Sequence, residues 1–226
     1  MDQEMNQQID QQADNGGVLA VCPRKKNDKK PVVFYADRMT FNNETILYRD
    51  IESVSTYGSE MNYNVIFTFY SSYVTFKLND GRKLKWKNGM FGMFGLGSLK
   101  SKSACYSAMI EATLATVAKT IAARYITQVR QGATIKIGPV TIDPNGITGK
   151  HFAKTQTTPF SDISGADYSA CQVHIHRASV RKTAVNSVSS QVDNGICLIY
   201  IINSLATGTS GAQAGAPEDE APANEE

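Results

Sequence analysis

The sequence predicts a mainly β protein that also contains helices, an α+β chain of two modules in which antiparallel strands are closed by a carboxy-terminal helix. An aromatic residue, a polar residue and Asp-Ile occur together twice, at Tyr48–Ile51 and Phe160–Ile163, with the two aspartates 112 positions apart in a chain of 226. Each copy follows two alternating stretches joined by a polar turn, and helical periodicity appears after each copy. The two halves are therefore expected to be diverged copies of one module.

Composition divides the chain into four parts. Residues 1–17 and 207–226 are polar and acidic, without apolar periodicity, and are expected to be disordered tails. Between them we expect a first module over residues 18–131, ending in a long helix, and a shorter second module over residues 132–206.

Charge is unevenly distributed along the chain. The two tails carry nine acidic residues and no Lys or Arg, so the remainder holds 12 acidic and 23 basic residues, a formal charge of +11. A basic core attracts acidic partners, such as phospholipid headgroups or nucleic acid, over long range. Acidic tails that keep a basic domain in solution are the structural alternative.

The first module is expected to begin with a short strand over residues 18–22 and a loop bounded by Pro23 and Pro31. Alternation of apolar and polar residues then continues to about residue 87, with a hairpin signal at Asn79-Asp80-Gly81. These patterns predict a run of short antiparallel strands.

The last of these strands carries a one-sided charge pattern. Leu84 and Trp86 share one face, and Lys83, Lys85 and Lys87 share the other. The strand is therefore expected to bury one side and to present a ladder of cations on the other.

The segment Gly89–Gly97 interrupts the strand pattern, because glycine recurs every third residue with large apolar residues between. It lacks the glycine and lysine spacing of a phosphate-binding P-loop. A membrane-dipping loop is one interpretation, and a packed connection or protein contact is the favoured one. The candidate contact residues are Met90, Phe91, Met93, Phe94 and Leu96.

Two helices are expected. The first extends from about Ser103 to Gln131, with a single apolar stripe and Gly132 as its stop. The second opens at Asp193 or Asn194, because either side chain is a good cap, and ends near residue 206.

This order of strands and helix, with the aromatic-x-Asp-Ile step, resembles the pleckstrin homology-like superfamily, including its bacterial, GRAM-related members. The resemblance implies two tandem barrels or strongly bent antiparallel sheets, each of seven strands and each closed by its helix. It implies a binding role and no catalysis. The second module has about 75 residues where about 100 are usual, so a missing strand or a shared sheet is expected there.

The resemblance also indicates a candidate anion site. In phosphoinositide-binding members the loop after the first strand gathers the phosphate ligands, and here that loop is rich in cations. A solvated lysine-rich turn is the alternative. The candidate residues are Arg24, Lys25, Lys26, Lys29 and Lys30, with Lys83, Lys85 and Lys87 as additions.

No pattern predicts catalysis, a metal or a cofactor. His174 and His176 share one face of a predicted strand and could ligate a metal if a third ligand such as His151 came near. Nothing in the sequence places His151 there. No nucleophile motif or zinc-protease helix occurs, so we do not expect an enzyme.

Four scattered cysteines and the absence of a signal peptide predict a cytoplasmic chain with free thiols. A peripheral position at the inner membrane face is the alternative location. We expect another protein as the partner, with an anionic membrane surface second. Nucleic acid is third, through the basic helix and tyrosines such as Tyr63, Tyr70 and Tyr73.

Overall fold

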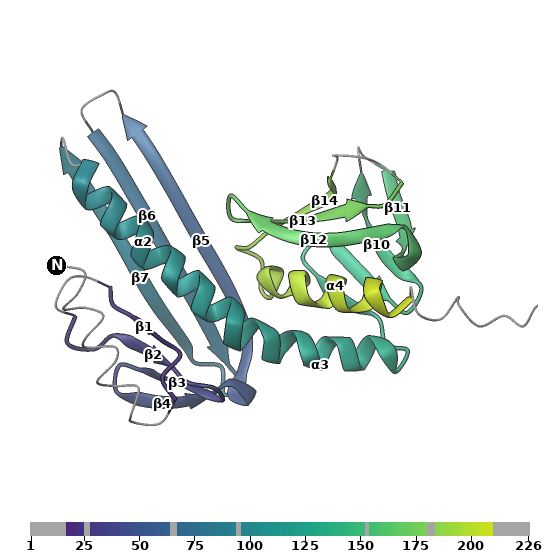
Figure 1. Ribbon diagram of the computed structural model, residues 1–226, viewed down its shortest axis with the longest axis horizontal. Coiled ribbons are helices and arrows are strands. Elements are labelled where there is room, and N and C mark those ends of the chain that lie inside the picture. The colour runs from purple at the N-terminus through teal and green to yellow at the C-terminus, as the bar shows by residue number, and fades with distance from the viewer. Residues whose placement is uncertain are drawn as a thin grey trace, which may run out of the picture.

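The computed structural model describes residues 17–24, 28–63, 67–93, 96–151, 154–179 and 184–209 (Figure 1). Lys25, Lys26, residues 1–16 and residues 210–226 lie outside this part, whereas residues 207–209, expected to begin the acidic tail, belong to the last helix. The described chain confirms the α+β class, with four antiparallel sheets and helices at the ends of the two halves. Within these residues no sheet closes into a barrel.

Repeat 1, residues 20–130, contains two sheets and a long helix. The first sheet is an antiparallel meander of four strands in chain order: β1 (Ala20–Cys22), β2 (Val32–Phe34), β3 (Arg38–Phe41) and β4 (Glu44–Leu47). A 3₁₀ turn, η1 (Tyr48–Asp50), leads to a sheet of three long strands: β5 (Ile51–Tyr63), β6 (Phe67–Leu78) and β7 (Lys83–Met93). Helix α2 (Leu96–Thr113) continues through a π-helical turn, η2 (Leu114–Ala118), into α3 (Lys119–Arg130).

Repeat 2, residues 135–209, has the same order of elements. Its first sheet comprises β8 (Ile135–Ile137), β9 (Val140–Asp143), β10 (Gly146–His151) and β11 (Lys154–Pro159). The 3₁₀ turn η3 (Phe160–Asp162) leads to β12 (Ile163–Ser169), β13 (Gln172–Arg177) and β14 (Ala184–Ser189). A 3₁₀ turn, η4 (Gly195–Cys197), then precedes helix α4 (Leu198–Thr209).

Among the described residues, the short second half therefore has seven strands in two sheets of its own, as repeat 1 does. Its three-stranded sheet has strands of 6 or 7 residues, against 11 to 13 in repeat 1, and α4 has 12 residues. Repeat 2 is smaller because its three-stranded sheet and its helix are shorter. The residue count alone could not distinguish this from a lost strand.

The aromatic-x-Asp-Ile step forms the corner between the two sheets of each repeat. Tyr48 and Phe160 are buried in 3₁₀ turns, and Ile51 and Ile163 begin the next strand with buried side chains. In both repeats a β-bulge follows the isoleucine directly. The two corners thus share local structure as well as sequence.

The backbone bonds at the two corners also correspond. The N–H of Asn79 donates to the Asp50 carbonyl at 2.9 Å, and the N–H of Ala178 donates to the Asp162 carbonyl at 2.8 Å. Each bond joins the corner to the residue directly after the central strand of the three-stranded sheet, β6 in repeat 1 and β13 in repeat 2. The sequence repeat is therefore a repeat of hydrogen bonding.

The long helix joins the two repeats. In Figure 1 α2 follows the β5–β7 sheet and α3 continues beside α4 of repeat 2, and α3 and α4 are in contact. Buried side chains of both repeats, including Trp86, Val117 and Ile201, belong to one continuous apolar core. The repeats consequently pack as one body.

Two local expectations are wrong. Strand β7 does not end before Gly89 but continues to Met93, because Gly89 and Gly92 pair in register with β6, and the helix already begins at Leu96. Asn194 precedes the last helical segment as expected, but it adopts a left-handed conformation (φ 63°) and its side chain makes no capping hydrogen bond. The Asn194 side chain instead forms hydrogen bonds with Val54 and Tyr125.

Candidate interaction surface

The β5–β7 sheet has one buried face and one outward face. Val54, Phe76 and Trp86 are fully buried on the first, against which α2 packs. On the outward face of β7 the side chains of Lys83, Lys85 and Lys87 are exposed, as the alternation predicts. We call these three residues the lysine ladder.

Two tyrosines lie beside the lysine ladder. The rings of Tyr57 and Tyr73 stack with centroids 4.8 Å apart and planes 19° from parallel, and Lys85 Nζ lies 3.6 Å from the Tyr73 centroid. Because β6 lies between β5 and β7, Tyr57 and Lys85 approach Tyr73 from opposite sides. Both faces of the Tyr73 ring are therefore covered, which leaves little room for a nucleic acid base to stack there.

The lysine ladder has no internal counter-charge in the described part of the chain. The neighbouring Lys77 is paired with Glu52, with Nζ 2.7 Å from Oε1. Lys83, Lys85 and Lys87 have no carboxylate within 4.0 Å among the described residues. Three exposed lysines thus place their charge on one face of the sheet, with the Lys85 ammonium over the Tyr73 ring.

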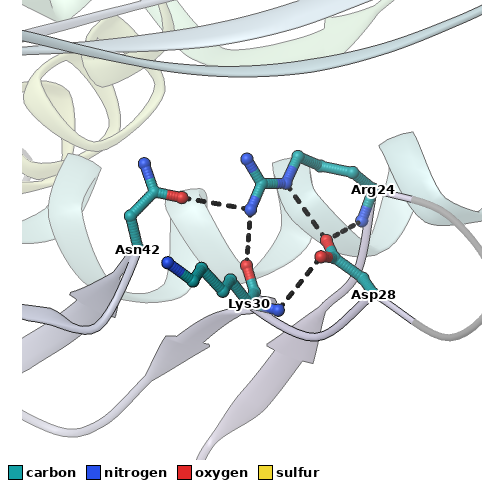
Figure 2. A network of polar contacts seen from close by, with 4 residues as sticks. All are labelled: Arg24, Asp28, Lys30 and Asn42. Carbon is teal, nitrogen blue, oxygen red and sulfur yellow. Dashed lines mark hydrogen bonds and ion pairs between the residues drawn. The ribbon is translucent and has the colours of Figure 1, made fainter.

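The loop between β1 and β2 is held by Arg24 (Figure 2). Its Nε and backbone N–H donate to Asp28 Oδ2 at 3.1 and 2.9 Å, and its Nη2 donates to the Lys30 carbonyl and to Asn42 Oδ1 at 2.6 and 3.1 Å. Burial alone would raise the pKa of Asp28, but the N–H groups of Arg24 and Lys30 and the guanidinium hold that pKa below its ordinary value. Arg24 therefore acts as a structural tie between the loop and the β3–β4 turn.

Of the other loop candidates, Lys29 and Lys30 are exposed, while Lys25 and Lys26 lie outside the described residues. A second ion pair, between Arg82 and Glu44 at 2.8 Å, joins the β6–β7 turn to β4 beside the Asn42–Asn43 turn. The groove at this junction is lined by Glu44, Asp50 and Asp80 against one guanidinium, that of Arg82. This groove is poorly suited to phosphate, because its carboxylates outnumber its cations.

The glycine-aromatic candidates cannot be placed as a surface. The side chains of Met90, Phe91, Met93 and Leu96, and Phe94 as a whole, lie outside the described residues. Their backbone shows only that the first three continue β7 and that Leu96 begins α2.

The histidine pair lies on the predicted face of β13. His176 Nε2 is 2.6 Å from Asp167 Oδ2, and His174 Nδ1 is 2.9 Å from Ser187 Oγ. The side chain of His151 lies outside the described residues. Within the part of the chain that the structure describes, no three His, Cys, Asp or Glu side chains form a metal-binding group.

The described cysteines are free thiols. Cys22 and Cys197 are fully buried, and burial raises the pKa of Cys22 to about 12 and raises that of Cys197 as well. These two thiols are therefore poor nucleophiles at neutral pH.

Sequence reasoning missed the residues that bond to the β5 edge of the β5–β7 sheet. The N–H of Asn194 donates to the Val54 carbonyl at 2.8 Å, Asn194 Oδ1 accepts from the Val54 N–H at 3.0 Å, and the Ser190 carbonyl accepts from the Thr56 N–H at 2.7 Å. These contacts join positions more than 130 residues apart, and no local signal marks them. Only the chemistry of Asn194, which can donate and accept at once, was visible in the sequence.

No protein-family model matches this chain, and no curated protein matches its sequence. None of the helices among the described residues combines the length and the hydrophobicity needed to cross a lipid bilayer.

Proposed function

We propose that the protein is a non-catalytic binding or scaffold protein built from two repeats of pleckstrin homology-like type. Support comes from the order of elements, four strands, a 3₁₀ corner, three strands and a helix, which occurs twice. The proposal concerns repeats of two separate antiparallel sheets each, because no sheet among the described residues closes into a barrel. Fold alone does not define an activity, so the role is argued from the surface.

The proposed partner is another protein, and the lysine ladder carries this proposal. Its three ammonium groups are exposed on one strand of a well-packed sheet and lack a carboxylate partner within the described residues. A preformed, charged and rigid surface loses little conformational entropy on binding. We place the protein in the cytoplasm, where such a surface would meet acidic protein segments.

Affinity capture from the native host tests the proposed function. The triple variant K83E/K85E/K87E is compared with wild type and with R49E/R130E/K136E, which makes the same charge change at exposed basic residues elsewhere. We expect a specific protein to be enriched by wild type and by the control, and lost with the lysine ladder variant. Equal recovery by all three proteins would contradict the proposal.

Binding to anionic phospholipid headgroups through residues 24–30 is the second proposal, favoured by the exposure of Lys29 and Lys30. Co-sedimentation with vesicles containing phosphatidylserine should then fall when Lys25, Lys26, Lys29 and Lys30 are changed to Glu. Nonspecific nucleic-acid binding is third, supported by the basic core. It should give steeply salt-dependent binding to random oligonucleotides.

A further inference from the structure

The two edges of the β5–β7 sheet differ in their backbone hydrogen bonds. At β5 the outward backbone groups belong to Val54 and Thr56, which bond to Asn194 and Ser190 of repeat 2. Since Val54 and Thr56 point away from β6, their register partners Phe76 and Val74 direct their own backbone groups to the other side, towards β7.

This alternation determines which backbone N–H and C=O groups of β7 face β6 and which face away from it. Phe76 and Val74 stand opposite Leu84 and Trp86, so these pairs exchange the hydrogen bonds between β6 and β7. The Leu78 N–H, which donates to the Arg82 carbonyl at 2.9 Å, follows the same alternation. The N–H and C=O groups of the intervening residues must therefore point away from β6, and these residues are Lys83, Lys85 and Lys87.

No described residue forms a hydrogen bond with these groups. Strand β7 is the last in its sheet, and among the described residues no backbone hydrogen bond outside the β6 pairing involves Lys83, Lys85 or Lys87. The same three residues therefore combine exposed ammonium groups with an open row of backbone donors and acceptors. Trp86, fully buried between them, anchors the strand.

Charge selects the occupant of this edge. A second copy of the chain paired along β7 would set lysines against lysines, and like charges on facing strands are destabilising. An extended segment with acidic residues at alternate positions would instead meet the ladder with opposite charge while its backbone fills the open row.

We propose that β7 is a docking edge, onto which an acidic, extended segment of a partner protein adds as a further strand. This inference rests on the proposed role in protein binding and names the partner's chemistry. The side chains of the lysine ladder select the segment, and the backbone of the same residues holds it.

A binding measurement separates backbone pairing from charge attraction. The probe is a fluorescent peptide of alternating Thr and Glu, about ten residues long, measured by anisotropy. The control peptide has the same sequence with alternate backbone nitrogens methylated, so it keeps the charge but loses half of its donors. We expect wild type to bind the first peptide at least about tenfold more tightly than the second, because several hydrogen bonds are lost.

Two variants at one position complete the test. Lys85→Gln removes a charge and keeps the outward N–H, whereas Lys85→Pro removes both, and proline is tolerated on a strand edge where its nitrogen faces solvent. We expect Lys85→Pro to bind roughly tenfold more weakly than Lys85→Gln. Equal affinity of these two variants, or equal affinity of the two peptides for wild type, would overturn strand addition.

The peptide comparison uses wild-type protein, so it decides the question even if Lys85→Pro fails to fold. Failure of this inference is distinguishable from failure of the proposed function. If the host protein captured by wild type is lost with K83E/K85E/K87E but retained by Lys85→Pro, the lysine ladder binds a partner through side chains alone.

Discussion

Val54 of repeat 1 and Ala166 of repeat 2 occupy the same position, the third residue after the isoleucine of the corner, and each has its N–H and C=O bonded to one asparagine. For Ala166 the partner is Asn203 of α4, in the same repeat, at 2.7 and 3.1 Å. For Val54 it is Asn194, from the other repeat. Repeat 2 thus completes its own sheet edge, whereas repeat 1 depends on repeat 2.

The difference has a consequence for binding. Because repeat 2 occupies the β5 edge, β7 is the edge of this sheet that remains open within the described residues. The long helix contributes to the same junction, since Tyr125 of α3 accepts a hydrogen bond from Asn194 Nδ2 at 3.0 Å. Repeat 2 therefore serves as a structural support for the surface on repeat 1.

The largest expected effects concern the corner aromatics. Tyr48→Ala and Phe160→Ala each remove a buried ring and should lower the free energy of unfolding by about 3–5 kcal/mol. Urea denaturation measures this, with Leu19→Ala as a control, because Leu19 is 59% exposed. If one corner variant were as stable as the control, the two corners would not be equivalent.

Asn194→Ala should come next. It leaves the buried Val54 N–H without its acceptor and removes the bond to Tyr125, at a cost of about 1–3 kcal/mol. Asn203→Ala is the matched variant, and its effect should centre on repeat 2. Amide hydrogen exchange should become faster at Val54 in Asn194→Ala and at Ala166 in Asn203→Ala. Faster exchange at Ala166 in Asn194→Ala, with Val54 unchanged, would refute the pairing of Asn194 with Val54.

A smaller effect is expected at Gly58, which lies against Cys171 of repeat 2. A Cβ there would lie 3.0 Å from Cys171 Sγ and 3.0 Å from Tyr106 Cε1, so Gly58→Ala should destabilise by about 1–2 kcal/mol. Adding Cys171→Ala should restore part of the loss, because it removes the sulfur. Strictly additive effects in thermal unfolding would show that Gly58 and Cys171 do not meet.

The smallest effect is the acid sensitivity of the corner in repeat 2. Hydrogen bonds from Ser179 and the Arg177 guanidinium, with Nε 2.6 Å from Oδ2, hold the pKa of Asp162 below its ordinary value of 3.8. A depressed pKa stabilises the folded state above 3.8, and this contribution disappears as the pH falls through the folded-state pKa.

The control for this prediction is Asp162→Asn. Its unfolding free energy should lie below that of wild type at neutral pH, and the difference should shrink as the pH falls below 3.8. A difference that stays constant down to strongly acidic pH would exclude Asp162 as the titrating group.

The sequence predicted features that depend on local pattern. The corner step is readable because an aromatic residue, an aspartate and an isoleucine recur at one spacing, and the lysine ladder is readable because strand side chains alternate. The continuation of β7 through Gly89 was missed, since pairing with β6 outweighs the poor strand preference of glycine.

The junction between the repeats was not predictable in the same way. Asn194 precedes a helical segment, where capping is the ordinary role, yet its partner Val54 is 140 residues away. Such a contact depends on how two finished repeats pack, so no window of sequence contains it. Arg24 is a candidate anion ligand through the family resemblance, and its bonds to Asp28 and Asn42 were likewise not readable from the sequence.

Amide hydrogen exchange resolved by residue tests the central claim most directly, because it reads both edges of one sheet together. Without a ligand, the N–H groups of Val54 and Thr56 should exchange slowly, and those of Lys83, Lys85 and Lys87 should exchange fast. Addition of the alternating Thr-Glu peptide should slow exchange at the three lysines and leave Val54 and Thr56 unchanged. Protected lysine amides in the free protein, or amides that stay unprotected with peptide bound, would contradict an open docking edge at β7.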